Sequence, residues 1–93
     1  MTAYNQVNGL HASEHPELLR NILRKDFGFD GMIMSDWGGT YSCKESIEAS
    51  LDLEMPGPSM MRGAMIERYV LSGKLTVNDV DDCVLRVSWV VAS

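Results

Sequence analysis

The stretch MIMSDWGGT, residues 32–40, places an acidic side chain and a tryptophan directly after an apolar run. MIMS has the length and composition of a short buried strand, and the two glycines that follow allow the backbone to turn away. Asp36 and Trp37 therefore stand where a strand is predicted to end. In parallel α/β folds, ligands bind at the carboxyl ends of the strands, so these two residues are candidates for a functional site.

Predicted strands and helices alternate on both sides of this stretch. The expected strands are 1–4, 31–36 and 51–55, and the expected helices are 16–27, 43–50, 59–72 and a last one that opens at 76. This alternation implies parallel strands joined by helical crossovers, which is an α/β arrangement. Three parallel strands alone would leave the edges of the sheet open. We therefore expect the chain to be part of a larger α/β domain.

The apolar residues of the expected helices recur at helical spacing. The predicted buried faces are Leu18, Leu19, Ile22, Leu23 and Phe27 in the first helix, with Arg20, Arg24 and Lys25 outside; Met61, Met65, Tyr69 and Val70 in the third; and Val80, Val84, Val87 and Val91 in the last. Gly28 and Gly73 are expected to end helices. SCKE at 42–45 and TVND at 76–79 have the spacing of capping boxes.

Composition and charge exclude several classes of protein. The chain of 93 residues has a formal net charge of -5, which argues against binding of nucleic acid or of an anionic membrane. No window has the roughly 20 continuous apolar residues of a membrane span, and MTAYNQVNGL lacks the features of a signal peptide. Cys43 and Cys83 have no Cys-x-x-Cys partner, so we expect two free thiols. No cofactor is expected.

Asp36 is the strongest single candidate for chemistry. A carboxylate held at a strand end can act as nucleophile, base or metal ligand, and the flat apolar face of Trp37 suits the C–H-rich face of a sugar ring. The alternative is an aspartate that caps a helix beside a core tryptophan, and the pattern alone supports both interpretations about equally. Tyr4, at the end of the first predicted strand and before Asn5, is expected to face a polar cleft.

Asp52 and Glu54 are expected to share one face of the third strand, because strand side chains alternate. Together with Asp36 they would be able to hold Mg²⁺. The interpretation that we favour is that they satisfy buried backbone donors or a neighbouring arginine, so no metal site is predicted. His11 and His15 are expected to be loop and cap residues rather than ligands.

Three motifs in collinear order resemble glycoside hydrolase family 3, in particular fungal β-glucosidases. They are MTAYNQVNG at 1–9, SEHPELLRNILRKDFGFDGMIMSDWGGTYS at 13–42 and SLDLEMPGP at 50–58. The resemblance implies an incomplete TIM-like (β/α)₈ barrel made of about the last three strands with their helices. Residues 1–93 would then be part of the N-terminal barrel domain, with the second, α/β sandwich domain absent.

The resemblance also implies an activity, the retaining hydrolysis of terminal non-reducing β-D-glucosyl residues from β-glucosides or cello-oligosaccharides. Asp36 falls on the family's nucleophile, and Trp37, Tyr4 and Met1 fall on residues that line the glucose pocket. The general acid of the family lies in the second domain, so this chain is expected to contain none and to be inactive alone. Many full-length fungal relatives are secreted.

Two other functions remain open from the residues alone. One is a remnant without catalysis that serves only in binding. The other is a metal-dependent α/β enzyme that uses Asp36, Asp52 and Glu54 as ligands.

Overall fold

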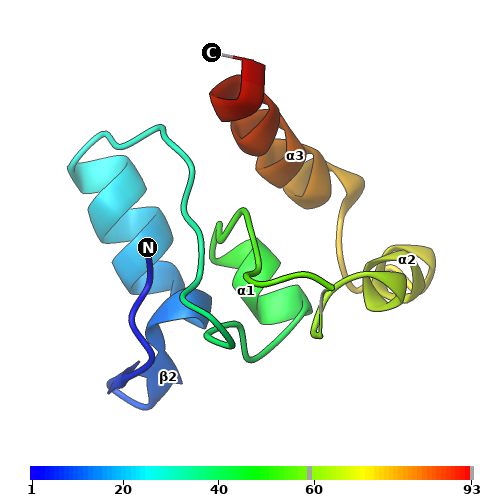
Figure 1. Cartoon of the computed structure of the whole chain (residues 1–93), viewed down its shortest axis with the longest axis horizontal. Helices are drawn as coiled ribbons and strands as arrows, with labels where there is room; N and C mark the ends of the chain where they lie inside the picture. Colours follow the sequence, from blue (N-terminus) through cyan, green and yellow to red (C-terminus); the bar gives the residue numbers. More distant parts are fainter. Residues whose placement is uncertain (59, 93) are drawn as a thin grey trace.

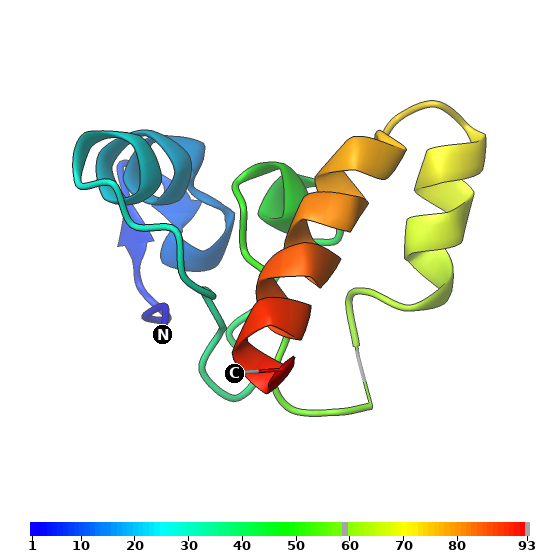
Figure 2. The same ribbon diagram turned by 90° about the horizontal axis from the view of Figure 1, so that it is seen from above.

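The computed structural model describes residues 1–58 and 60–92. In chain order the elements are β1 (Gln6–Val7), β2 (Leu10–His11), the 3₁₀ helix η1 (Ala12–Glu14), the π-helix η2 (Glu17–Asp26), α1 (Lys44–Glu48), α2 (Ala64–Leu71) and α3 (Val77–Ala92). Figure 1 shows α1 near the centre, with η2 on the left, α2 on the right and α3 above it. In the view from above in Figure 2, η2 and α2 again lie at opposite sides, and α3 lies in front of α1. None of the described helices is long and apolar enough to span a membrane.

The three predicted strands lie side by side and run parallel. Thr2 pairs with Ser35, and Met34 pairs with Leu53, each as a single parallel bridge. The Thr2 N–H donates to the Met34 carbonyl at 2.8 Å, and the Ser35 N–H donates to the Leu53 carbonyl at 3.0 Å. The prediction that 31–36 and 51–55 are adjacent and parallel, with α1 between them in the chain, is therefore confirmed.

Full strands do not form, because side chains replace backbone partners on both sides of the Met34–Leu53 bridge. The Ile33 N–H donates to the Asp52 carboxylate at 2.9 Å, and the Met55 N–H donates to the Ser35 hydroxyl at 2.9 Å. In a regular parallel ladder both donors would reach carbonyl oxygens of the neighbouring strand. The pairing consequently stops after one bridge, and the prediction of regular strands here is wrong.

A β-hairpin forms at residues 6–11, where His11 was expected to be a loop residue. Gln6 pairs with His11 and Val7 with Leu10. The connecting residues Asn8 and Gly9 both have positive φ, 51° and 86°, as a two-residue hairpin turn with matching twist requires. His11 therefore lies in a strand rather than in a loop.

The core consists of two apolar clusters that meet at α1. The first contains the buried residues Leu19, Ile33, Ala49 and Leu51. The second contains the buried residues Cys43, Ile47, Leu75 and Cys83. Both cysteines are free, as predicted, and burial raises the pKa of each thiol. Residues of η2, α2 and α3 thus contribute to the core on the two sides of this short central helix.

The predicted helix faces are correct in part. Leu19 is buried, but Phe27 is 76% exposed, and Val84 and Val91 on α3 are 57% and 82% exposed. The side of α3 that carries Cys83 faces the core instead. Arg24, expected outside, points inward because it pairs with the buried carboxylate of Asp52.

The sequence predicted where two helices end and where three begin. Both predicted ends and one predicted start are confirmed. Gly28 and Gly73 have φ values of +69° and +76° after η2 and α2, and the Thr76 hydroxyl accepts the Asp79 N–H at 3.2 Å. The capping box at 42–45 is wrong, because Cys43 rather than Ser42 precedes α1 and already has helical backbone angles. The helix expected over 59–72 begins only at Ala64; residue 59 itself lies outside the described residues.

Candidate functional site

Asp36 follows the middle one of the three parallel segments and begins a tight loop. Its carboxylate Oδ1 accepts the Trp37 N–H at 2.8 Å, and its carbonyl accepts the Gly39 N–H at 2.8 Å. Gly38 has a φ of +71°, and a Cβ at Gly39 would lie only 3.1 Å from the Asp36 carbonyl oxygen. The two glycines therefore permit the tight turn that follows Asp36.

Tyr4 reaches this loop from the first parallel segment. Its hydroxyl donates to the Trp37 carbonyl at 2.7 Å. Partial desolvation raises the pKa of the Tyr4 phenol, and the nearby negative charge of Asp36 raises that pKa further. Tyr4 therefore keeps its proton at neutral pH and acts as a hydrogen-bond donor.

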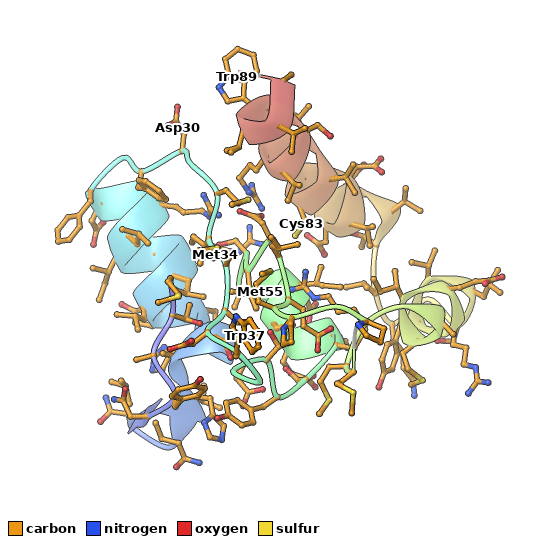
Figure 3. The ribbon with its side chains drawn as sticks, in the orientation of Figure 1. Asp30, Met34, Trp37, Met55, Cys83 and Trp89 are labelled. Carbon is orange, nitrogen blue, oxygen red and sulfur yellow. The ribbon has the colours of Figure 1, made fainter. Side chains whose placement is uncertain are left out.

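The indole of Trp37 is 71% exposed. Figure 3 places it near the middle of the molecule with Met55, far from Trp89 at the end of α3. Asp36 caps no helix, since α1 begins only at Lys44. The interpretation as a helix cap beside a core tryptophan is therefore wrong. Met1, the fourth predicted site residue, lies on the Tyr4 segment and is also largely exposed.

Asp52 forms a buried ion cluster with two arginines. Its Oδ2 lies 2.7 Å from Arg24 Nη2, its Oδ1 lies 2.7 Å from Arg86 Nε, and its side chain has no exposed surface. Burial lowers the pKa of Arg24; in Arg86 burial has the same effect, but the hydrogen bond and charge of Asp52 outweigh it and raise the pKa. Asp52 therefore joins η2 to α3, in agreement with its predicted pairing to an arginine.

Glu54 holds the segment that leads to α2. Its Oε2 accepts the N–H groups of Met60 and Met61 at 3.2 and 2.9 Å, and its Oε1 accepts the N–H of Arg62 at 3.2 Å. The predicted role as acceptor for backbone donors is confirmed. Since Asp52 and Glu54 are both occupied, the site of three carboxylates for Mg²⁺ does not form. Within residues 1–58 and 60–92, no group of three or more His, Cys, Asp or Glu side chains is placed to hold a metal ion.

Two further residues support the loop, His11 and Tyr41, which were not predicted to belong to the site. The rings of His11 and Tyr41 stack with centroids 3.7 Å apart and an angle of 19° between their planes. His11 Nδ1 lies 2.9 Å from the Tyr4 carbonyl oxygen. The Asn8-Gly9 pair is a strong hairpin signal, and it would have placed His11 in a strand beside the Tyr4 segment.

The family model described as "Glycosyl hydrolase family 3 N terminal domain" matches residues 1–90. The chain therefore belongs to glycosyl hydrolase family 3, as its three motifs indicated.

Curated relatives in this family carry β-glucosidase names. The chain is 54% identical over 87 residues to "Probable beta-glucosidase J" of Emericella nidulans, which covers 94% of this chain and 10% of that protein. It is 49% identical over 94 residues to "Probable beta-glucosidase I" of Aspergillus niger, which covers 97% of this chain and 12% of that protein. The chain thus spans about a tenth of the length of the curated relatives that it matches.

Solved structures of β-glucosidases contain the same arrangement. The structure from Kluyveromyces marxianus in complex with glucose matches with a TM-score of 0.89 and 46% identity, covering 91% of this chain and 10% of that chain. β-Glucosidase 3B from Thermotoga neapolitana in complex with α-D-glucose matches with a TM-score of 0.81 and 34% identity. The match covers 90% of this chain and 13% of that chain. The local fold described above is therefore shared with these enzymes.

Proposed function

We propose that these residues are the nucleophile-bearing part of a β-glucosidase, an enzyme that hydrolyses terminal non-reducing β-D-glucosyl residues with retention of configuration. The observation that carries the proposal is the position of Asp36. It stands at the carboxyl end of the middle parallel segment, beside an exposed indole and a tyrosine that holds the same loop. β-Glucosides and cello-oligosaccharides are the substrates that follow from it.

The proposed architecture is an incomplete TIM-like barrel. In this proposal the segments around Thr2, Met34 and Leu53 are consecutive barrel strands, and residues 1–93 belong to the N-terminal domain. Their parallel order and the matches to two β-glucosidase structures support it. Active sites of such barrels lie at the carboxyl ends of the strands, which is where Asp36 is found.

In the proposed mechanism, a carboxylate oxygen of Asp36 attacks the anomeric carbon while the bond to the aglycone oxygen breaks. A general acid gives that oxygen its proton, and water then hydrolyses the glucosyl ester. Trp37 packs against the C–H face of the ring, and Tyr4 and Met1 complete this wall. Glu54 is unsuited as the acid, because three backbone N–H groups already bind its carboxylate. The proton donor is therefore assigned to a residue outside this segment.

Covalent trapping tests the assignment of the nucleophile. A full-length enzyme that carries these residues should react with a 2-deoxy-2-fluoro-β-glucoside bearing a good leaving group. The fluorosugar slows hydrolysis of the glucosyl ester, so mass spectrometry of peptides should find the label on Asp36. The Asp36→Asn variant is the control and should remain unlabelled. Labelling of Glu54 would contradict the assignment.

The 93-residue polypeptide alone is expected to show no enzymatic hydrolysis of p-nitrophenyl β-glucoside. A positioned general acid contributes about 10²–10⁴-fold, and the family resemblance places that acid in another domain. Release of nitrophenol by the purified polypeptide is the measurement. An Asp36→Ala version of the same polypeptide reveals contaminating host enzyme. Turnover that depends on Asp36 would mean that these residues suffice for catalysis.

A further inference from the structure

Within the loop that carries Asp36 and Trp37, the Trp37 and Gly39 N–H groups both donate to Asp36. We call residues 36–41 the nucleophile loop. Gly38 and Gly39 lie at its centre, and glycine backbones have more conformational freedom than any other residue type. Three contacts hold the loop from outside. Tyr4 donates to the Trp37 carbonyl, the Gly38 N–H donates to the Met55 carbonyl, and His11 stacks on Tyr41.

A single side chain, His11, contacts both Tyr4 and Tyr41 and so connects the two ends of the loop. Its Nδ1 lies 2.9 Å from the Tyr4 carbonyl oxygen. A carbonyl oxygen only accepts, so Nδ1 carries the proton and donates. The other ring nitrogen, Nε2, is then free to accept from the Gln6 amide at 3.4 Å. Hydrogen bonds at both nitrogens leave the flat face of the ring for Tyr41.

The hairpin determines where the imidazole lies. His11 is paired with Gln6 in a two-residue ladder closed by the Asn8-Gly9 turn, and the Ala12 N–H donates to the Asn5 carbonyl at 3.1 Å. The imidazole is therefore attached to a short, closed backbone unit that lies directly after Tyr4. A shift of this unit would move Tyr4 and Tyr41 together.

We propose that His11 is a positioning residue for the glucosyl site. It touches neither the sugar nor the reacting atoms in this proposal. It fixes Tyr4 through the carbonyl and the end of the nucleophile loop through Tyr41, and so sets the place of the Trp37 ring relative to the Asp36 carboxylate. The inference rests on the proposed function, because it concerns the alignment of a glucosyl ring between Trp37 and Asp36.

Matched substitutions separate the two contacts of His11. His11→Phe keeps an aromatic ring for the stack and removes the donor to Tyr4. His11→Asn keeps an N–H donor near the position of Nδ1 and removes the stack. Tyr41→Leu removes the stack from the other side, and Tyr41→Phe is the control that preserves it.

The experiment measures kcat and KM for p-nitrophenyl β-glucoside, together with the thermal midpoint, in the full-length enzyme. Small misplacements of a bound substrate cost one to two orders of magnitude in rate, so we expect kcat/KM to fall roughly tenfold in His11→Phe and Tyr41→Leu. Most of the loss should appear in KM, because the wall that binds the sugar is displaced. Tyr41→Phe should stay near the wild type.

The combination of His11→Asn with Tyr41→Leu gives a second, independent test. Both changes break the same stack, so the double variant should lose no more than the worse single variant. If the fold-losses in kcat/KM of the two single variants multiply in the double variant, the proposal is overturned. Unchanged kcat/KM in His11→Phe and Tyr41→Leu would also overturn it. If His11→Phe fails to fold, His11→Asn and Tyr41→Leu decide the question in its place.

The Asp36→Asn variant distinguishes failure of this inference from failure of the proposed function. If Asp36→Asn remains active, the proposed function is wrong whatever the His11 variants do. If Asp36→Asn is inactive and the His11 and Tyr41 variants behave as the wild type, only the positioning role is wrong.

Discussion

Replacement of Asp36 by asparagine should lower kcat for β-glucosides by roughly 10⁴-fold or more, as the loss of catalytic nucleophiles does in other enzymes. The asparagine amide forms no stable glucosyl intermediate. Its oxygen can still accept the Trp37 N–H that Asp36 Oδ1 accepts at 2.8 Å. The loop geometry should therefore survive, and the loss should lie in chemistry rather than in folding.

Steady-state kinetics of the full-length enzyme on p-nitrophenyl β-glucoside measure this effect. Asp30→Asn is the matched control, since Asp30 is an exposed aspartate six positions earlier in the chain. The thermal midpoints of both variants should match that of the wild type. Near wild-type turnover in Asp36→Asn would show that the nucleophile is another group.

Replacement of Asp52 by asparagine should lower the free energy of unfolding by about 3–5 kcal/mol, because it leaves buried arginines without their counter-ion. Arg24 and Arg86 both bind the Asp52 carboxylate at 2.7 Å, and its side chain is fully buried. Asparagine matches the shape but carries no charge, so the two guanidinium groups would repel each other. Urea-induced unfolding of the protein that carries this segment is the measurement.

An exposed ion pair gives the control for Asp52. Lys44 and Glu48 pair across one turn of α1 with partly exposed side chains. Because solvent screens such pairs, Glu48→Gln should change the stability little. Equal effects of Asp52→Asn and Glu48→Gln would contradict the account of the buried cluster.

The sequence predicted those features of the fold that depend on local signals. The short apolar runs around Met34 and Leu53 indicated neighbouring parallel segments, and the structure pairs these two residues. Gly28 and Gly73 indicated helix ends, and both have the expected positive φ. Each of these signals is contained within a few residues of the chain, which is why it could be read directly.

For features that depend on a distant partner, the kind of partner was predicted for Asp52 and Glu54, but its position in the chain was not. Arg24 has the spacing of an outward residue on its helix, but the carboxylate of Asp52, 28 positions later, and oxygens of Ser50 and Gly31 draw it inside. The interruption of the strands has the same origin, because Asp52 takes the Ile33 N–H. Periodicity records which residues are apolar, and it contains no information on which polar side chains meet.

For the candidate site, too, the positions of some residues were predicted but their contacts with distant residues were not. Asp36 and Tyr4 were expected at the ends of neighbouring strands, and the Tyr4 hydroxyl does reach the loop after Asp36. Their catalytic and binding roles remain predictions. The stack of His11 on Tyr41 joins positions 30 apart in the chain, so no local pattern indicated it.

The contacts that hold the nucleophile loop act mainly on its main chain. Tyr4 binds the carbonyl of Trp37, and the Gly38 N–H binds the carbonyl of Met55 at 3.0 Å. Neither contact involves the indole of Trp37 or the thioether of Met55. Evolution can therefore exchange these two side chains without moving the carboxylate of Asp36. In the proposed enzyme, changes at these two positions would alter the surface beside the sugar while the proposed nucleophile keeps its place.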